Sequence, residues 1–505
     1  MKITFIYPDV IGSANYGGIF NLGIGLLSSV LKNEGFETSL IHITQPTKKN
    51  EFRKYLEKEK ADIYAFSCTT PMFNFVKEWA GWIKEYDRDK PVLVGGVHAI
   101  LNPDEVLAVE TIDYVCIGEG EQSLKELCLA LKQVKDASAI KGIWSKVQGE
   151  IIKTAGRPII NDLDSIPFAD RIIFDYKNLM EGREQMFFIM ASRGCPYNCP
   201  YCCNQSLRQS ISANQPWVRF RSVDNVIDEI KSVLNLYPKT KFIGFYDDIL
   251  ALQEDWFREF THKYKKYINL PFRCNMRADY LAKEEITRMM EEAGCRRVII
   301  GLESGNEEIR NGILQRNMSD DVLIKAAKLC KKYRIEFATF NMVGLPGERL
   351  DQLLDTVKLN ARLNADFTYT SIFYPFPKTS LYNLCEDKDL LTDCVITDYV
   401  EGSSLNFDRA SIARIMFIRN FFRPLMNLYI MIDKLPLKTK RAAVNSLDAV
   451  LSSKIIASTI FNFANYVFRV VRENRLFSSL INSIKRKSKK RKINAFNSSV
   501  KTDSQ

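Results

Sequence analysis

Apolar and polar positions alternate in a regular order over residues 1–145. Five short apolar runs rich in β-branched residues have the length of strands, at residues 3–7, 38–43, 63–67, 92–94 and 114–117. Longer stretches with helical periodicity lie between them, at residues 22–33, 73–85 and 121–132. Strands that alternate with helices predict a doubly wound, Rossmann-like α/β domain, which binds ligands at the carboxyl ends of its strands.

Small and polar residues follow three of these predicted strands. They are Ser67 and Thr69, then Gly95, Gly96 and His98, and finally Gly118, Glu119 and Gly120. Glycine lets a ligand approach the backbone closely, and free backbone N–H groups suit amide and phosphate groups. Ordinary turns would also use glycine, so this pattern predicts a ligand-binding edge without naming the ligand.

The alternation returns after a connector at residues 146–184, which contains a predicted hairpin around Gly149. Six further strands are predicted at residues 185–192, 242–246, 272–274, 297–301, 336–343 and 369–373, with helices such as 223–236 and 283–293 between them. Six βα units predict a partial barrel with its site at the carboxyl ends of the strands. The chain thus divides into a doubly wound domain (1–145), a connector (146–184), a partial (βα)6 barrel (185–402) and a helical, basic region (403–505).

Three cysteines follow the first strand of the predicted barrel. Cys195, Cys199 and Cys202 lie in the run Arg-Gly-Cys-Pro-Tyr-Asn-Cys-Pro-Tyr-Cys. Three thiolates can hold three irons of a [4Fe–4S] cluster and leave the fourth iron open to a small molecule. A structural zinc site would need a fourth ligand nearby, yet Cys203 is poorly placed and no His lies between residues 99 and 261. The spacing therefore favours a cluster held by three catalytic cysteines.

This Cys-x3-Cys-x2-Cys spacing, with an aromatic residue before the last cysteine, resembles the signature of radical S-adenosylmethionine (SAM) enzymes. The glycine-bearing edge upstream is similar to the cobalamin-binding domain of one large group of them, the class B radical SAM methyltransferases. The resemblance implies a [4Fe–4S] cluster, SAM and cobalamin as cofactors. It also implies an electron donor such as flavodoxin or ferredoxin.

Polar residues at the carboxyl ends of the predicted barrel strands suit the functional groups of SAM. The candidates are Tyr201, Asp247, Asp248, Arg277, Glu303, Ser304 and Gly344. Either aspartate suits the ammonium or a substrate hydroxyl, Arg277 suits the carboxylate, and Glu303 can accept hydrogen bonds from the ribose. The resemblance implies similar roles, with Tyr201 at the adenine. An ordinary surface-loop position is the alternative for each polar side chain.

Many cobalamin-binding domains carry Asp-x-His-x-x-Gly, whose histidine ligates the cobalt. The chain has only three histidines, His42, His98 and His262, and none lies in that pattern. We therefore expect cobalamin to bind without a histidine lower ligand, with His98 lining its pocket. A degenerate domain that binds no cobalamin is the alternative.

The positive charge of the chain is concentrated in its C-terminal region. The net charge is +11, and residues 403–505 hold 20 Lys and Arg against 5 Asp and Glu. A helical stripe at residues 456, 460, 463, 467, 470, 474, 477, 481 and 484 is apolar except at Asn474, and seven cations follow within residues 485–492. An amphipathic basic helix of this kind favours peripheral contact with an anionic membrane surface. Packing on the barrel is a second reading; nucleic-acid binding is disfavoured because aromatic and basic residues do not interleave.

The cysteine content refines the expected setting. Twelve cysteines without an N-terminal signal peptide predict a reducing, cytoplasmic compartment. Within it, the basic C-terminal region would allow peripheral contact with the inner face of the membrane. The predicted function is radical methylation of an unactivated carbon in a hydrophobic, lipid-like or natural-product small molecule. Cyclisation or rearrangement without methyl transfer, a non-catalytic cobalamin and iron–sulfur sensor, and tRNA modification are the alternatives.

Overall fold

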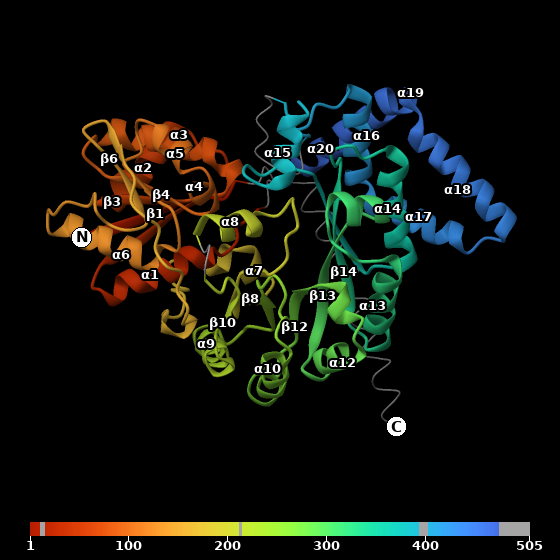
Figure 1. Ribbon diagram of the computed structural model, residues 1–505, viewed down its shortest axis with the longest axis horizontal. Coiled ribbons are helices and arrows are strands. Elements are labelled where there is room, and N and C mark those ends of the chain that lie inside the picture. The colour runs from red at the N-terminus through yellow and green to blue at the C-terminus, as the bar shows by residue number, and fades with distance from the viewer. Residues whose placement is uncertain (11–15, 212–214, 393–401, 474–505) are drawn as a thin grey trace.

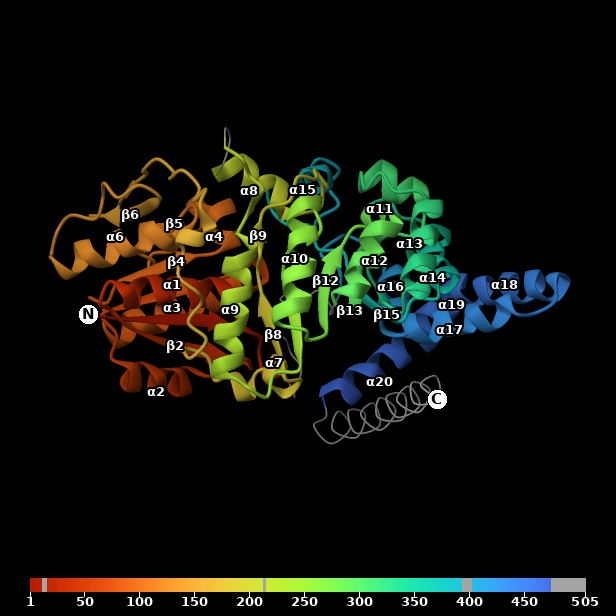
Figure 2. The same cartoon turned by 90° about the horizontal axis from the view of Figure 1, so that it is seen from below.

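The computed structural model describes residues 1–10, 16–211, 215–392 and 402–473. Two sheets lie side by side, each covered by helices, and the C-terminal helices pack on the side of the second sheet away from the N-terminal domain (Figure 1). The view from below shows the same order along the long axis, from the N-terminal domain to the C-terminal helices (Figure 2). The site discussed below lies where the two sheets meet.

The first sheet has seven strands in the order β2-β1-β3-β4-β5-β6-β7. They are β1 (Lys2–Pro8), β2 (Glu37–Ile43), β3 (Ile63–Ser67), β4 (Val92–Gly95), β5 (Tyr114–Cys116), β6 (Ile143–Val147) and β7 (Glu150–Ile152). The first five are parallel, and the strand order reverses direction between β1 and β3. Such a reversal opens a crevice for ligands at the carboxyl ends of the strands.

Helices cover both faces of this sheet. They are α1 (Leu22–Asn33), α2 (Lys49–Glu59), α3 (Phe73–Tyr86), α4 (Val97–Leu101), α5 (Pro103–Ala108) and α6 (Gly120–Lys132). Helix α1 begins where the Asn21 side chain accepts a hydrogen bond from the Ile24 N–H, which satisfies a donor that the helix cannot. Strand β1 is buried along nearly its whole length, as a parallel strand between two helical layers must be.

The second sheet has six parallel strands in the order β15-β14-β13-β12-β11-β8. They are β8 (Met186–Ile189), β11 (Phe242–Phe245), β12 (Phe272–Met276), β13 (Cys295–Glu303), β14 (Glu336–Val343) and β15 (Phe367–Ile372). On its convex side lie α9 (Val223–Leu236), α10 (Glu254–Tyr267), α12 (Glu284–Glu292), α13 (Asp320–Lys332) and α14 (Leu350–Leu363) (Figure 1). A doubly wound domain followed by a parallel half-barrel confirms the predicted fold class.

Alternation along the strands of the half-barrel separates its two faces. Phe272, Cys274 and Met276 of β12 join the core under the convex helices, as do Val298 and Ile300 of β13. Because successive side chains point to opposite faces of a strand, the residues between them face the concave side. The concave face therefore carries the polar and aromatic residues discussed below.

Two segments differ from the sequence-based expectation. The run 185–192, expected as one strand, divides into β8 and the short β9 (Ser192–Arg193), which pairs antiparallel with β10 (Arg219–Phe220). The ladder breaks there because the Ala191 N–H donates to the Asp247 carboxylate. The predicted hairpin around Gly149 forms as β6 and β7, and β6 pairs antiparallel with β5. The start of the connector thus extends the first sheet.

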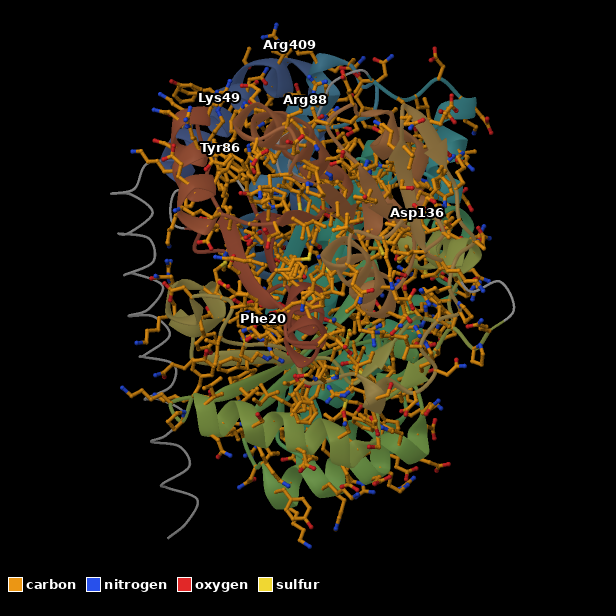
Figure 3. The ribbon with its side chains drawn as sticks, turned by 90° about the vertical axis from the view of Figure 1, so that its left-hand side faces the viewer. Phe20, Lys49, Tyr86, Arg88, Asp136 and Arg409 are labelled. Atoms are coloured by element: carbon orange, nitrogen blue, oxygen red, sulfur yellow. The ribbon has the colours of Figure 1, made fainter. Side chains whose placement is uncertain are left out.

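The chain between the two sheets holds them together. The centres of the Phe20 and Phe174 rings lie 4.9 Å apart, and the Arg171 guanidinium lies 4.5 Å from the centre of the Phe20 ring. Arg171 in turn donates to Glu229 of α9 at 2.8 Å, and Figure 3 shows Phe20 where the N-terminal domain meets the helices of the half-barrel. Helix α7 (Met180–Arg183) completes the junction, because its Glu181 accepts the Phe20 N–H.

Among the described residues, six α-helices follow β15: α15 (Ser380–Asp387), α16 (Arg409–Asn420), α17 (Phe422–Asp433), α18 (Leu437–Ser452), α19 (Lys454–Ile456) and α20 (Asn462–Glu473). A π-helical turn at Ala457–Phe461 joins the last two. Phe461 stacks on Phe417 of α16 at 3.9 Å, so α20 packs back onto the body of the protein. Among the described residues no single helix has the length and apolar character to span a membrane; one pair bent by 52°, Leu437–Ser452 with Lys454–Arg469, passes on length and composition alone.

Candidate functional site

The three cysteines lie in one loop between β9 and α8 (Cys203–Ile211). Cys199 is buried, whereas Cys195 and Cys202 are partly exposed. The Cys202 N–H donates to the Cys199 carbonyl at 3.0 Å, which closes the loop into a turn. Among the described residues no three His, Cys, Asp or Glu side chains stand ready as a metal site, so the loop supplies the ligands without holding them in final coordination geometry.

The thiols of this loop differ in their acidity. The hydrogen bond from Cys203 lowers the pKa of Cys202 to about 7, so its thiolate forms readily. Burial raises the pKa of Cys195 to about 11, and the charges of Asp248, Cys202 and Cys199 add to the shift. The short spacing of the three cysteines in one loop keeps them within reach of a single polynuclear centre.

A buried network joins the cysteine loop to the end of β13. The Arg316 guanidinium donates to the Tyr201 hydroxyl at 2.7 Å and to the Gly301 carbonyl at 2.5 Å, and its Nη1 lies 3.8 Å from Cys199 Sγ. Glu303 lies 4.0 Å from Arg316 and accepts a hydrogen bond from Tyr201. Burial raises the pKa of Glu303, while Arg316 and Tyr201 oppose the shift. Arg316 was not foreseen from the sequence, because it lies in a loop with no distinctive motif.

Asp247, one of the two aspartates predicted to meet SAM or the substrate, is bonded within the protein. Its carboxylate is fully buried and accepts from the Ala191 N–H at 3.0 Å and the Ser192 hydroxyl at 2.5 Å. Burial raises the pKa of Asp247 to about 6, against the opposing effect of these hydrogen bonds. Asp247 therefore fixes the break between β8 and β9 that leads into the cysteine loop.

Its neighbour Asp248 does face the loop. Its carboxylate accepts from Asn204 Nδ2 at 3.1 Å, and the same amide group lies 3.7 Å from Cys202 Sγ. Burial raises the pKa of Asp248. Of the two aspartates, Asp248 is therefore the one placed to meet a cationic group beside the cysteines.

Arg277 lies directly behind the cysteine loop. Its guanidinium stacks 3.7 Å from the Tyr197 ring and donates to Asp279 at 3.1 Å and to the Arg316 carbonyl at 3.0 Å. A guanidinium held on one face by an aromatic ring retains donors along its edge. The structure thus brings Arg277 close to the loop, although an internal carboxylate already shares its charge.

Two loops at the ends of β13 and β14 hold the remaining barrel candidates. The Ser304 side chain is buried, and its Oγ accepts the Asn306 N–H at 3.3 Å. The Gly344 N–H donates to Glu348 at 2.8 Å, and the second oxygen of that carboxylate has no partner among the described residues. Burial raises the pKa of Glu348 to about 8, so it is mainly protonated at neutral pH. The loop after β14 is thus a tight, neutral turn.

The candidate ligand edge of the first sheet lies opposite the cysteine loop. Ser67 ends β3 and Thr69 follows it, Gly95 ends β4 and Gly96 follows it, and Gly118 and Gly120 follow β5. Helix α4, which follows β4, packs against α8, which follows the cysteines. Gly96 has φ +94°, and a Cβ there would lie 2.6 Å from the Cys68 carbonyl oxygen, so only glycine fits. The two carboxyl edges therefore face each other.

His98 is buried beneath this edge. Its Nδ1 lies 3.2 Å from the Thr70 hydroxyl, its ring stacks 4.3 Å from Phe73, and its Nε2 has no hydrogen-bond partner among the described residues. Burial lowers the pKa of His98 to about 4, so the imidazole is neutral, and the 3.6 Å approach of Glu105 is no ion pair at neutral pH. The buried imidazole thus lies beneath the edge with one nitrogen unpartnered among the described residues.

Glu119, a predicted cofactor-binding residue, forms several hydrogen bonds within the protein. Its carboxylate accepts from Arg193 at 2.9 Å, from both terminal nitrogens of Arg219 at 2.9 and 3.0 Å, and from the Ile160 N–H at 2.7 Å. Glu121 accepts a further bond from Arg193 at 2.5 Å. Although burial alone would raise it, the two guanidinium groups lower the pKa of Glu119. Glu119 thus joins the first domain to Arg193, two residues before Cys195.

A doubly wound domain whose ligand edge faces a three-cysteine loop on a parallel half-barrel defines a radical SAM enzyme with an accessory binding domain. Two family models match the chain, the B12 binding domain over residues 9–128 and the radical SAM superfamily over residues 189–359. Together they cover more than half of the chain. The chain therefore belongs to the radical SAM enzymes that carry an N-terminal B12-binding domain.

Named relatives agree with this assignment. An uncharacterized methyltransferase from Pyrococcus horikoshii is 26% identical over 372 residues, which are 73% of this chain and 79% of the relative. The anaerobic magnesium-protoporphyrin IX monomethyl ester cyclase of Rubrivivax gelatinosus is 24% identical over 77% of this chain and 70% of the relative.

Solved structures share the fold. The cobalamin-dependent SAM radical enzyme OxsB aligns with a TM-score of 0.66 and 18% identity, over 97% of this chain and 75% of OxsB. The radical SAM methyltransferase TsrM from Kitasatospora setae aligns with a TM-score of 0.61 and 17% identity, over 78% of this chain and 77% of TsrM. At these identities the likeness concerns the arrangement of both domains.

Proposed function

We propose that this chain is a cobalamin-dependent radical SAM methyltransferase that acts on an unactivated carbon of a small molecule. The carrying observation is the ligand edge of the B12-binding domain held opposite the three-cysteine loop, with Glu119 bonded to both Arg193 and Arg219. Two cofactors bound at these facing edges would share one space with a substrate. The relatives named as methyltransferases support the methyl-transfer outcome.

Cys195, Cys199 and Cys202 are the residues that would hold a [4Fe–4S] cluster, and their shared loop and the lowered pKa of Cys202 fit that donor set. Such a cluster supplies the one-electron reduction on which SAM cleavage depends. We assign the delivery of that electron to flavodoxin or ferredoxin. The Arg316 guanidinium beside Cys199 offsets part of the negative charge of a thiolate-bound centre.

SAM would lie on the polar end of the concave face. Asp248 is placed for its ammonium and Arg277 for its carboxylate. Glu303 accepts from ribose hydroxyls, with Tyr201 and Arg316 orienting its carboxylate. Ser304 and the tight turn at Gly344, whose N–H is bonded to Glu348, would border the SAM site. Asp247 is a positioning residue, because it acts only through Ala191 and Ser192.

Cobalamin would occupy the edge formed by Ser67, Thr69, Gly95, Gly96, His98, Gly118 and Gly120. Cobalamin carries the methyl group that the reaction transfers. We infer that no histidine ligates its cobalt: His42 Nε2 is bonded to Asp9 at 3.0 Å, His98 is buried beneath the edge, and His262 lies on α10 of the other domain. Neutral His98 and the adjoining hydroxyls suit the amide side chains of a corrin.

Anaerobic reconstitution with iron, sulfide, SAM and methylcobalamin tests the proposal. Cys199→Ala should lose the iron–sulfur absorbance and the release of 5′-deoxyadenosine, whereas Cys330→Ala, another buried cysteine outside the loop, should keep both. Deoxyadenosine release by Cys199→Ala contradicts the cluster assignment. With substrate, a methylated product supports methyl transfer; deoxyadenosine without methylation supports a cyclase or rearrangement; no turnover of SAM supports a sensor.

We further propose peripheral contact with an anionic membrane through the C-terminal helices. The apolar stripe predicted from the sequence faces outward: Ile460 is 60% exposed and Phe463 is 69% exposed. Phe461 and Phe468 lie off that stripe and pack inward. Phe461 stacks on Phe417 of α16, and Phe468 contacts Phe421 edge-on. The helix therefore has two apolar faces, of which only one is used for packing. The stripe residues beyond 473 and the cations at 485–492 lie outside the described residues.

Sedimentation with vesicles separates this contact from simple packing. The full chain should bind vesicles that contain phosphatidylserine more strongly than neutral vesicles, and the binding should weaken as salt rises. Equal binding to neutral and anionic vesicles, or none to either, contradicts the proposal. The enzymatic proposal stands independently of this outcome.

A further inference from the structure

On the concave face of the half-barrel, one arginine has no carboxylate in contact among the described residues. Arg273 and Arg297 are register partners on β12 and β13, and both alternate away from the convex core. Arg297 donates to Glu336 at 2.9 Å and stacks 3.7 Å from Phe367. The Arg273 guanidinium has no hydrogen-bond or ion-pair partner among the described residues. The two neighbouring arginines therefore differ, because Arg297 has a carboxylate in contact and Arg273 has none among the described residues.

A stack of rings holds Arg273 in place. Its guanidinium lies 4.6 Å from the centre of the Phe188 ring, and Phe188 stacks on Tyr246 at 4.2 Å with an angle of 12°. A Cβ at Gly244 would collide with the Phe188 ring, so a glycine on β11 makes room for this stack. A guanidinium fixed on its face keeps its N–H donors free along the edge, where they match a carboxylate or a phosphate.

Aromatic side chains stand exposed on the same concave face. Phe340 of β14 is 41% exposed and Tyr369 of β15 is 37% exposed, and their rings pair at 5.3 Å. The Tyr369 hydroxyl is near enough to act electrostatically on Arg273, as are Glu184 and Tyr246. Burial lowers the pKa of Arg273, because the cation is partly removed from water without an acid in contact. Small-molecule sites combine such apolar walls with a few fixed polar groups.

The rise per residue of β12 gives the approximate distance between Arg273 and Arg277. Arg277, behind the cysteine loop, lies four residues beyond Arg273 on the same face of the same chain segment. At about 3.3 Å per residue, the two guanidinium-bearing positions are about 13 Å apart. A group bound by Arg273 is therefore well separated from the reacting end of the cavity. A substrate that spans both positions has an extended shape.

We propose that the substrate carries an anionic group, a carboxylate or a phosphate, that binds Arg273, and an apolar or aromatic body that lies against Phe340 and Tyr369. This inference rests on the proposed function, because it takes the concave face to be the substrate cavity. It narrows the expected hydrophobic small molecule to an amphipathic anion. The anion lies at the amino-terminal end of β12, and the apolar body extends toward the cysteines.

Equilibrium binding to the full chain tests this, with biphenyl-4-carboxylate, biphenyl-4-yl phosphate and the neutral biphenyl-4-carboxamide as probes in titration calorimetry. The wild type should bind one or both anions at least about tenfold more tightly than the amide, because the neutral amide cannot form a charged hydrogen bond with Arg273. Arg273→Gln should lose this preference, and Arg273→Lys should keep part of it. Arg288→Gln on the outer helix α12 removes the same charge and should change nothing.

Three outcomes overturn the inference: equal affinity for anion and amide in the wild type, an undiminished preference in Arg273→Gln, or no binding of any probe. Thermal unfolding confirms that Arg273→Gln is folded, and Arg273→Lys provides the second variant. The tighter of the two anions identifies the headgroup. Because the titrations need no SAM turnover, they separate this inference from the proposed function: a chain that lacks cluster chemistry can still show the anion preference.

Discussion

The contact between the two domains offers the sharpest test of the structure. Glu119 receives four N–H groups, one from Arg193, two from Arg219 and one from the Ile160 backbone. Arg219 and Glu119 are both buried, with side chains 5% and 13% exposed. The substitution Glu119→Gln keeps the shape of the side chain and removes its charge. It also turns one acceptor into a donor that faces other donors.

The size of the effect follows from what is left behind. Arg193 keeps Glu121 as a partner, whereas Arg219 loses its only carboxylate in the described structure. Removing one partner of a buried ion pair costs about 3–5 kcal/mol because the other charge stays buried. With one arginine still paired, we expect the lower end, about 3 kcal/mol. The ion pair between Arg157 and Glu126 of α6 is more exposed than the pair of Arg219 with Glu119. Glu126→Gln should therefore cost less than about 1 kcal/mol.

Urea unfolding monitored by tryptophan fluorescence measures these differences, and a cycle with Arg219→Met isolates the pair. We expect a coupling energy of about 2 kcal/mol between Glu119 and Arg219. The pKa of Glu119 is lowered in the fold, so its contribution is complete above the unfolded value near pH 4.3 and is lost as pH falls below it. A coupling below about 0.5 kcal/mol, or a Glu119→Gln penalty no larger than that of Glu126→Gln, would refute the reasoning.

Three further predictions concern packing and buried charge. Gly244→Ala should lower the free energy of unfolding in urea by about 1–3 kcal/mol, because its Cβ meets the Phe188 ring. Gly81→Ala, which has open space around it in α3, should be neutral or stabilising. Equal effects of the two substitutions contradict the packing of Phe188 against Gly244. Phe461→Ala should cost about 3–5 kcal/mol and spare vesicle binding, whereas exposed Phe463→Ala should spare stability and weaken vesicle binding; the reverse would exclude the outward-facing stripe. Burial lowers the pKa of His98 to about 4, so the free energy of unfolding should fall by about 3 kcal/mol as pH decreases from 6.5 to 4, and His98→Gln should flatten that dependence; an unchanged slope contradicts a buried neutral imidazole.

Local patterns predicted what depends on local physics. The strands and helices of both sheets follow from alternating and helical periodicity, because burial of one face imposes that period directly on the sequence. Val223–Leu236 forms a helix with the predicted bounds. The spacing of Cys195, Cys199 and Cys202 likewise indicated a shared loop, since neighbours in sequence must be neighbours in space.

Long-range pairings could not be read in this way. Asp247 and Glu119 both lie at the predicted edges, yet each is bonded to a residue far away in the sequence, Ala191 and Arg219. A carboxylate at a strand end looks the same in the sequence whether it awaits a ligand or holds a neighbouring loop. Arg316 shows the converse, because only the fold brings it to Cys199 and Tyr201.

The internal bonds of these carboxylates have a consequence for the ligand edge. With Glu119 and Glu121 neutralised by Arg193 and Arg219, and with His98 uncharged, the loops after β3, β4 and β5 present hydroxyls, backbone N–H groups and an imidazole. A neutral edge selects neutral hydrogen-bonding groups over ions, as a corrin with amide side chains requires. Arg273 on the half-barrel has, by contrast, no hydrogen-bond or ion-pair partner among the described residues. The Glu119 bonds therefore have two effects, since they join the domains and also leave the ligand edge without net charge.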